Sequence, residues 1–202
     1  MKRTTLVLGL LIGLLFARVG GATLIDRGNG LIYDTVLDVT WLQNANLANQ
    51  TFTWQGAVDW ADNLVFSGFD DWRLPSMDVD GDTTVVDCDS AMEPACRDNE
   101  YGYMYYQDLG GILLGNMTGD QGPFTNIQPV YWSGTELAGT PDLAWVFNFV
   151  FGVQDVFFEE FNLLSAWAVR DGDVLSVPEP GSLVLLGVGL VGLGLARRRW
   201  RR

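Results

Sequence analysis

The chain has 202 residues, with 12 Lys or Arg against 25 Asp or Glu, two cysteines and no histidine. Its formal net charge of −13 excludes binding to the phosphate backbone of nucleic acids, which proteins hold through Lys and Arg. The lack of histidine excludes Ser-His-Asp and Cys-His nucleophilic sites and histidine-based zinc sites.

The first 22 residues have the pattern of a signal peptide. Lys2 and Arg3 precede an uncharged stretch over 4–17, and Gly20 and Ala22 supply the small side chains of a cleavage site. The apolar part is shorter than the about 20 residues that cross a bilayer. We therefore expect export and cleavage after Ala22, with an uncleaved anchor helix as the alternative.

Strand patterns follow directly after the predicted signal peptide. Two short apolar runs, 24–26 and 31–34, flank a Gly-Asn-Gly turn at 28–30 and predict a β-hairpin. Residues 39–42 predict a further strand of the same kind.

Helical spacing begins at Thr53. Apolar residues recur from there at i, i+3 and i+4 intervals, which predicts a helix that Thr53 caps and Gly68 ends. Residues 70–100 are rich in Asp, Gly and Pro without periodicity and predict a loop. A second helix is expected over about 104–114.

The last part of the body is strand-like. Four runs, 131–135, 143–150, 153–161 and 164–170, are rich in aromatic and β-branched residues, and the break at 151–152 predicts a hairpin. We expect an antiparallel meander here. The order of strands, helix, loop, helix and strands predicts one α+β domain over 23–175.

The end of the chain, 176–202, combines three features. A Pro178, Glu179, Pro180 motif precedes an uncharged Gly-rich apolar run over 181–196, and a basic cluster follows, formed by Arg197, Arg198, Arg199, Arg201 and Arg202. Arginines beside a membrane segment stay on the cytoplasmic side, so the body lies outside. This tail resembles the PEP-CTERM sorting signal, which implies a membrane exosortase as partner and a transient inner-membrane anchor. An ordinary single-span anchor is the alternative.

The body between these ends is strongly acidic. Residues 23–177 hold 4 basic and 24 acidic residues, a formal charge of 4 − 24 = −20, which attracts divalent cations. Carboxylates alternate around Gly81 and predict a calcium site whose candidate ligands are Asp78, Asp80, Asp82, Asp87 and Asp89. The spacing is not that of an EF-hand, and a solvated acidic loop is the alternative.

Cys88 and Cys96 lie eight positions apart within this loop. In an exported protein such a pair predicts one disulfide, with two free thiols as the alternative.

The body has seven tryptophans, and we expect at least five of them in the core. Its few arginines include Arg73 and Arg170, which we expect to pair with Asp70, Asp71 or Glu136.

Three short motifs, Trp-Arg-Leu-Pro at 72–75, Tyr-Trp-Ser-Gly-Thr-Glu at 131–136 and Ala-Trp-Ala-Val-Arg at 166–170, occur in an order that resembles the Lcl C-terminal domain family. The resemblance covers about 22–173 and implies a fold similar to C-type-lectin-like and formylglycine-generating-enzyme-like domains, without an enzymatic activity. The calcium motifs of sugar-binding lectins and the copper-binding cysteines of formylglycine-generating enzymes have no counterpart here.

These observations predict a non-catalytic protein of the cell envelope, cell surface or extracellular matrix that binds exopolysaccharide or calcium. The alternative is a carboxylate-dependent glycan hydrolase, because such enzymes need only two well-placed carboxylates.

Overall fold

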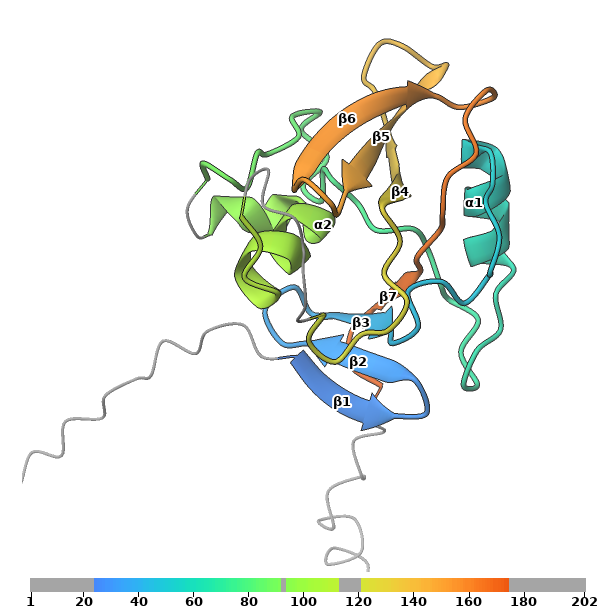
Figure 1. Cartoon of the computed structure of the whole chain (residues 1–202), viewed down its shortest axis with the longest axis vertical. Helices are drawn as coiled ribbons and strands as arrows, with labels where there is room; N and C mark the ends of the chain where they lie inside the picture. Colours follow the sequence, from blue (N-terminus) through green and yellow to red (C-terminus); the bar gives the residue numbers. More distant parts are fainter. Residues whose placement is uncertain (1–23, 92–93, 113–120, 175–202) are drawn as a thin grey trace, which may run out of the picture.

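The computed structural model describes residues 24–91, 94–112 and 121–174. Within them, two antiparallel sheets and two short helices enclose one core, so the predicted α+β class is confirmed (Figure 1). No helix in these ranges combines the length and the apolar composition needed to cross a bilayer. The predicted signal peptide, the sorting motif with its apolar run, and the terminal arginines lie outside the described residues.

The first sheet has four strands in the order β1-β2-β3-β7. Its strands are β1 (Leu24–Gly28), β2 (Leu31–Asp34), β3 (Val39–Leu42) and β7 (Val169–Asp171). The predicted hairpin is confirmed, because β1 and β2 pair in antiparallel fashion across the Gly-Asn-Gly turn. All three turn residues have positive φ angles, between 55° and 80°, a region that glycine and asparagine tolerate best.

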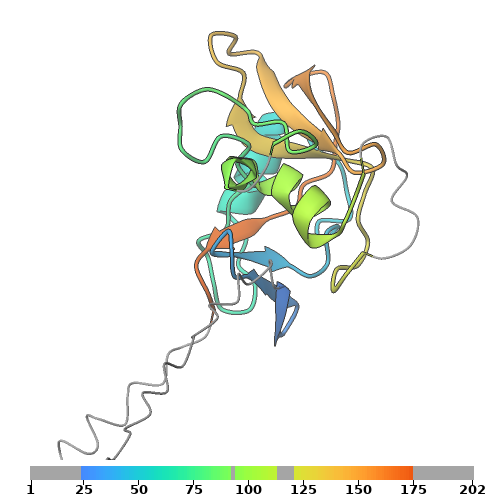
Figure 2. The same ribbon diagram turned by 90° about the vertical axis from the view of Figure 1, so that its left-hand side faces the viewer.

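The second sheet is a meander of three strands. It consists of β4 (Val130–Glu136), β5 (Leu143–Asn148) and β6 (Val153–Phe158), with Gly152 at a φ of 70° in the last turn. The meander was expected to continue through 164–170, but the final strand β7 instead pairs with β3 in the other sheet. The two sheets lie at opposite ends of the domain in both views (Figures 1 and 2).

Helix α1 (Trp54–Asp62) begins where the sequence predicts, and the Thr53 hydroxyl accepts a hydrogen bond from the Gly56 amide at 3.3 Å. The helix ends earlier than expected. Phe66 and Phe69 exchange backbone hydrogen bonds of 3.0 Å, so Gly68, at a φ of 89°, belongs to a tight turn rather than to the helix end.

The second helical segment begins at Glu100 rather than at about residue 104. It consists of α2 (Glu100–Tyr103) and a π-helical turn, η2 (Met104–Asp108), and follows a 3₁₀ turn, η1 (Ala95–Asp98). The earlier start has a local cause, because the Asn99 side chain accepts a hydrogen bond from the Gly102 amide at 2.9 Å and caps α2.

The core is aromatic and joins both sheets to both helices. The expectation of at least five core tryptophans is confirmed, because Trp60 and Trp145 alone keep intermediate exposure among the seven, and the buried ones are Trp41, Trp54, Trp72, Trp132 and Trp167.

Candidate functional site

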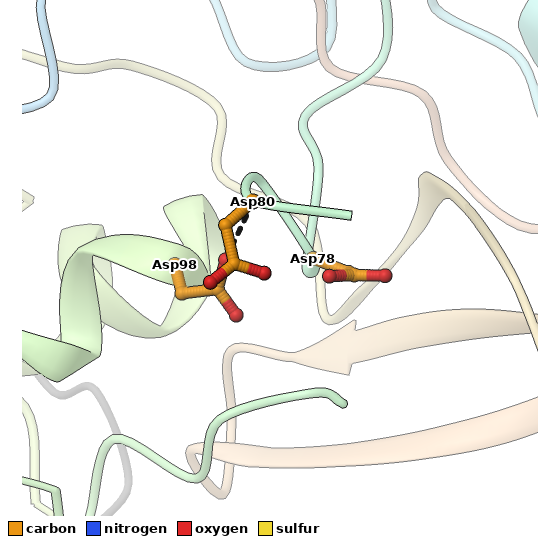
Figure 3. A group of neighbouring side chains, drawn as sticks. All are labelled: Asp78, Asp80 and Asp98. Atoms are coloured by element: carbon orange, nitrogen blue, oxygen red, sulfur yellow. Dashed lines mark hydrogen bonds between the residues drawn. The ribbon is translucent and has the colours of Figure 1, made fainter. Parts of the chain in front are cut away.

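Three carboxylates gather where the long loop meets η1. One oxygen from each of Asp78, Asp80 and Asp98 lies within 4.8 Å of the others (Figure 3). Two of these residues are among the predicted calcium ligands, and Asp98 is not. Carboxylate oxygens at this spacing are hard ligands of the kind that Ca²⁺ prefers.

Backbone hydrogen bonds hold the group together. The Asp80 amide donates to Asp98 Oδ1 at 2.9 Å, and the Val79 amide donates to the Asp98 carbonyl oxygen at 3.0 Å. The Asp78 amide donates to Ser76 Oγ at 3.1 Å, which orients the start of the loop. Asp80 and Asp98 are therefore positioned by contacts between the loop and η1, and Asp78 by a contact within the loop.

The electrostatics of the group favour a positive ligand. Burial raises the pKa of the Asp98 carboxyl, and repulsion from Asp80 and Asp78 adds to this, against the lowering effect of the amides that donate to it. Asp78 Oδ1 is buried, and no hydrogen-bond partner for it exists within the described part of the chain. A bound cation would relieve both the repulsion and this unsatisfied oxygen.

The other predicted ligands lie outside this group. Asp82 Oδ1 accepts from the Thr84 amide at 2.7 Å, and Asp87 Oδ1 accepts from the Asp89 amide at 3.4 Å. These carboxylates thus stabilise turns of their own loop.

The predicted disulfide between Cys88 and Cys96 is confirmed. Both cysteines are buried and pack with Tyr103 in a small cluster of their own. The crosslink joins the long loop to η1, which ends at Asp98. Asp98, two positions after Cys96, accepts a hydrogen bond from the Asp80 amide although eighteen positions separate the two aspartates.

Arg73 connects three segments of the chain. Its guanidinium donates to both oxygens of Glu100, at 2.8 and 2.7 Å, and to Asp171 Oδ1 at 2.6 Å. Glu100 also accepts from the Ser76 amide at 2.6 Å. The expected pairing of Arg170 with Asp71 is confirmed at 2.7 Å. For Arg73, the structure replaces the expected partners with Glu100 and Asp171.

A pocket of about 460 Å³ adjoins the group. Its lining mixes apolar side chains with polar groups; the apolar ones come from Trp54, Val58, Leu74 and Val79, and the polar ones from Asp62, Arg73, Ser76 and Asp171. Val79 lies between two of the clustered aspartates in the chain, so the pocket and the carboxylate group share a wall.

Comparison with models of known protein families shows which family the chain belongs to. The profile of the Lcl C-terminal domain matches residues 30–170. The chain belongs to the Lcl C-terminal domain family. A second profile, the PEP-CTERM protein-sorting motif, matches residues 176–202 and marks an exported protein that an exosortase processes from a transient C-terminal membrane anchor. No curated protein matches the chain.

The motifs that indicated the family meet one another inside the Lcl domain. Arg73 and Val169 exchange backbone hydrogen bonds of 2.8 and 2.9 Å, and the Gly134 amide donates to the Pro75 carbonyl oxygen at 2.8 Å. The motifs thus supply long-range contacts of the fold, whereas the carboxylate group lies outside them.

The Lcl domain also contains a buried carboxyl group. Asp34 is fully buried, and its Oδ1 accepts from the Val36 and Leu37 amides at 2.8 and 3.1 Å. Its Oδ2 has no hydrogen-bond partner within the described part of the chain. Burial raises the pKa of Asp34 above its ordinary 3.8, against the lowering effects of those amides, Asp108 and Arg97.

The buried Asp34 carboxyl predicts a pH dependence of stability. Because the folded pKa of Asp34 lies above the unfolded value, its stabilisation is complete below the unfolded pKa and is lost as pH rises through the folded pKa. Asp34→Asn removes the titration and keeps an acceptor for the two amides. Chemical unfolding at a series of pH values from roughly 4 to 8 should give a flatter stability profile for the variant. An identical slope in both proteins would contradict the prediction.

Proposed function

We propose that the Lcl domain of this exported protein is a non-catalytic binding module, and that its Asp78, Asp80 and Asp98 group binds Ca²⁺. The observation that carries the proposal is the convergence of three carboxylates from two separate segments within 4.8 Å. The disulfide and the backbone bonds between the loop and η1 pre-order these ligands, which lowers the entropic cost of binding.

The pocket beside the group supports exopolysaccharide as the second ligand of the module. The lining combines the exposed apolar side chain of Val79, which suits the carbon skeleton of a sugar, with the Ser76 hydroxyl and the Asp62 and Asp171 carboxylates, which suit its hydroxyls. The proposal includes a C-type-lectin-like fold, which the two antiparallel sheets and two helices around one core support. The protein would then serve at the cell surface or in the extracellular matrix after exosortase processing.

A calcium titration with thermal melting tests the metal site. Extracellular calcium modules bind with dissociation constants of about 10⁻⁴–10⁻³ M, so about 10 mM Ca²⁺ should stabilise the protein by roughly 1.4–2.7 kcal/mol. For a domain of this size the melting temperature should rise by roughly 3–10 °C. Magnesium at the same concentration controls for ionic strength.

Two matched variants decide which carboxylates are the ligands. Asp98→Asn should abolish the calcium shift, whereas Asp89→Asn, in the same loop but outside the group, should leave it intact. Protonation of Asp98 competes with calcium binding, and the pKa of Asp98 is raised. The calcium shift in melting temperature should therefore decline as the pH falls through this raised pKa. A calcium shift that depends on Asp89 and not on Asp98 would refute the site, as would no shift at all.

The non-catalytic assignment has its own test. The purified protein is incubated with a panel of bacterial glycans, and released reducing ends are measured. We expect no turnover. Turnover that a single carboxylate variant abolishes would establish the hydrolase alternative, because glycosidases depend on a pair of carboxylates.

A further inference from the structure

An ion pair joins the two ends of the described domain. Arg27 on β1 donates to Asp173 through Nε at 3.0 Å and through Nη2 at 2.5 Å. The side chains are only 16% and 27% exposed. The Arg27 guanidinium also lies 5.2 Å from the centre of the Tyr33 ring, and the Tyr33 hydroxyl donates to Asp38 at 2.7 Å. The pair is therefore packed and bidentate, which distinguishes it from a loose surface ion pair.

The chain after β7 is held to the sheet as far as this pair. The Gly172 amide donates to the Asp38 carbonyl oxygen at 2.7 Å, and Thr40 Oγ1 donates to the Gly172 carbonyl oxygen at 2.7 Å. Asp173 then binds Arg27. Gly172 and Asp173, the two residues that directly follow β7, thus both contact the sheet.

The sorting motif begins very close to this point. Four residues, 174–177, separate Asp173 from Pro178. A fully extended chain covers at most about 3.5 Å per residue, so the Cα atoms of Asp173 and Pro178 are no more than about 17 Å apart. On the other side, four residues separate Arg27 from the predicted cleavage after Ala22. The described domain begins at Leu24, three residues before Arg27 on β1, and ends at Val174, one residue after Asp173, so both membrane-directed segments join the domain at the four-stranded sheet.

We propose that the end of the four-stranded sheet that carries the Arg27–Asp173 pair is the membrane-facing pole of the precursor, and that this pair fixes the pole against the bilayer until the sorting segment is removed. The three-stranded sheet lies at the other end of the domain and faces away from the membrane (Figures 1 and 2). The inference rests on the sorting motif and the ion pair, and it is independent of the calcium and polysaccharide proposals.

Depth-dependent fluorescence quenching tests the pole. The full-length, unprocessed chain is reconstituted in phosphatidylcholine vesicles that contain a lipid with a nitroxide on its headgroup. Zwitterionic lipid avoids repulsion between anionic lipids and the acidic domain. Single cysteines for labelling replace Asn29, in the β1–β2 turn, or Asp155, on β6; the two native cysteines form a disulfide and do not compete for the label.

We expect quenching at position 29 to exceed quenching at position 155 by roughly twofold or more, because the tether is no longer than about 17 Å. A Gly/Ser linker of about 20 residues inserted after Val174 should remove the difference, because a flexible chain of that length lets the domain turn freely. Equal quenching at the two positions in the unmodified tether, or stronger quenching at position 155, would overturn the membrane-facing pole.

The role of the ion pair is tested by charge reversal. Asp173→Arg should reduce the quenching difference at least by half, and the swap Arg27→Asp with Asp173→Arg should restore it, because the swap rebuilds an opposite-charge pair at the same place. Asp71→Asn, which removes the charge partner of Arg170 and leaves the Arg27–Asp173 pair intact, is the matched control and should leave the difference unchanged. A difference that survives Asp173→Arg, or that the swap fails to restore while the protein melts cooperatively, would overturn the role of the pair.

Discussion

Replacing Arg73 with methionine is expected to lower the free energy of unfolding by about 3–5 kcal/mol. Arg73 donates to both oxygens of Glu100, whose side chain is only 3% exposed. Removing one partner of a buried ion pair leaves the other charge without compensation, and this is the costly case for buried pairs. The contact with Asp171 adds little, because that carboxylate is 80% exposed.

Denaturant unfolding of the variant measures this loss. Asp71→Asn breaks a bidentate arginine pair of similar geometry whose carboxylate is 54% exposed, so it should cost only about 0–1 kcal/mol. Adding Glu100→Gln to Arg73→Met should recover part of the stability, since the neutral amide needs no counter-ion. If Arg73→Met costs no more than Asp71→Asn, the buried pair does not stabilise the fold.

Trp167→Ala is expected to destabilise the domain by a similar amount, about 3–5 kcal/mol. Trp167 is fully buried, and its Nε1 donates to the Leu42 carbonyl oxygen of β3 at 2.8 Å. Its ring contacts five other rings, with centroids 4.9 to 6.4 Å away, in Trp41, Tyr101, Phe124, Tyr131 and Phe149. The substitution would therefore leave a cavity where β3, β4 and α2 meet.

The expected loss corresponds to a fall of roughly 6–20 °C in the melting temperature, which calorimetry can measure. Trp145→Ala is the matched control, because Trp145 is only partly buried and its truncation should cost about 1–2 kcal/mol. Trp167→Phe should lie between the two, since it keeps most of the apolar contact and loses the indole donor. Equal losses for Trp167→Ala and Trp145→Ala would contradict the central place of Trp167.

Features that depend on neighbouring residues could be predicted from the sequence. The β1–β2 turn follows from the tolerance of glycine and asparagine for positive φ, and the start of α1 follows from the hydroxyl of Thr53. The disulfide follows from two cysteines at short separation in an exported chain. In each case the stabilising contact lies within a few residues of the sequence pattern that predicted it.

The sequence predicted only part of the candidate site. Asp78 and Asp80 stand in an acidic run, but Asp98 stands apart from it between an arginine and an asparagine. The one available signal was the disulfide, which places η1 beside the loop. Asp82 resembles a ligand equally well in the sequence, yet its carboxylate accepts a hydrogen bond within its own turn. The alternating carboxylates in the sequence therefore predicted which loop contributes to the candidate site, but not which residues form it.

By itself, the amino-acid sequence determined the family, the sorting motif, the acidic body and most of the local turns and strands, because each is encoded in composition or in residues close together in the chain. Only the tertiary structure decided that β7 joins β3, that Arg73 pairs with Glu100 and that Asp98 approaches Asp80. These contacts are long-range, and each partner has chemically equivalent competitors among many strands and carboxylates. Packing of the aromatic core selects among them, and no local pattern records that choice.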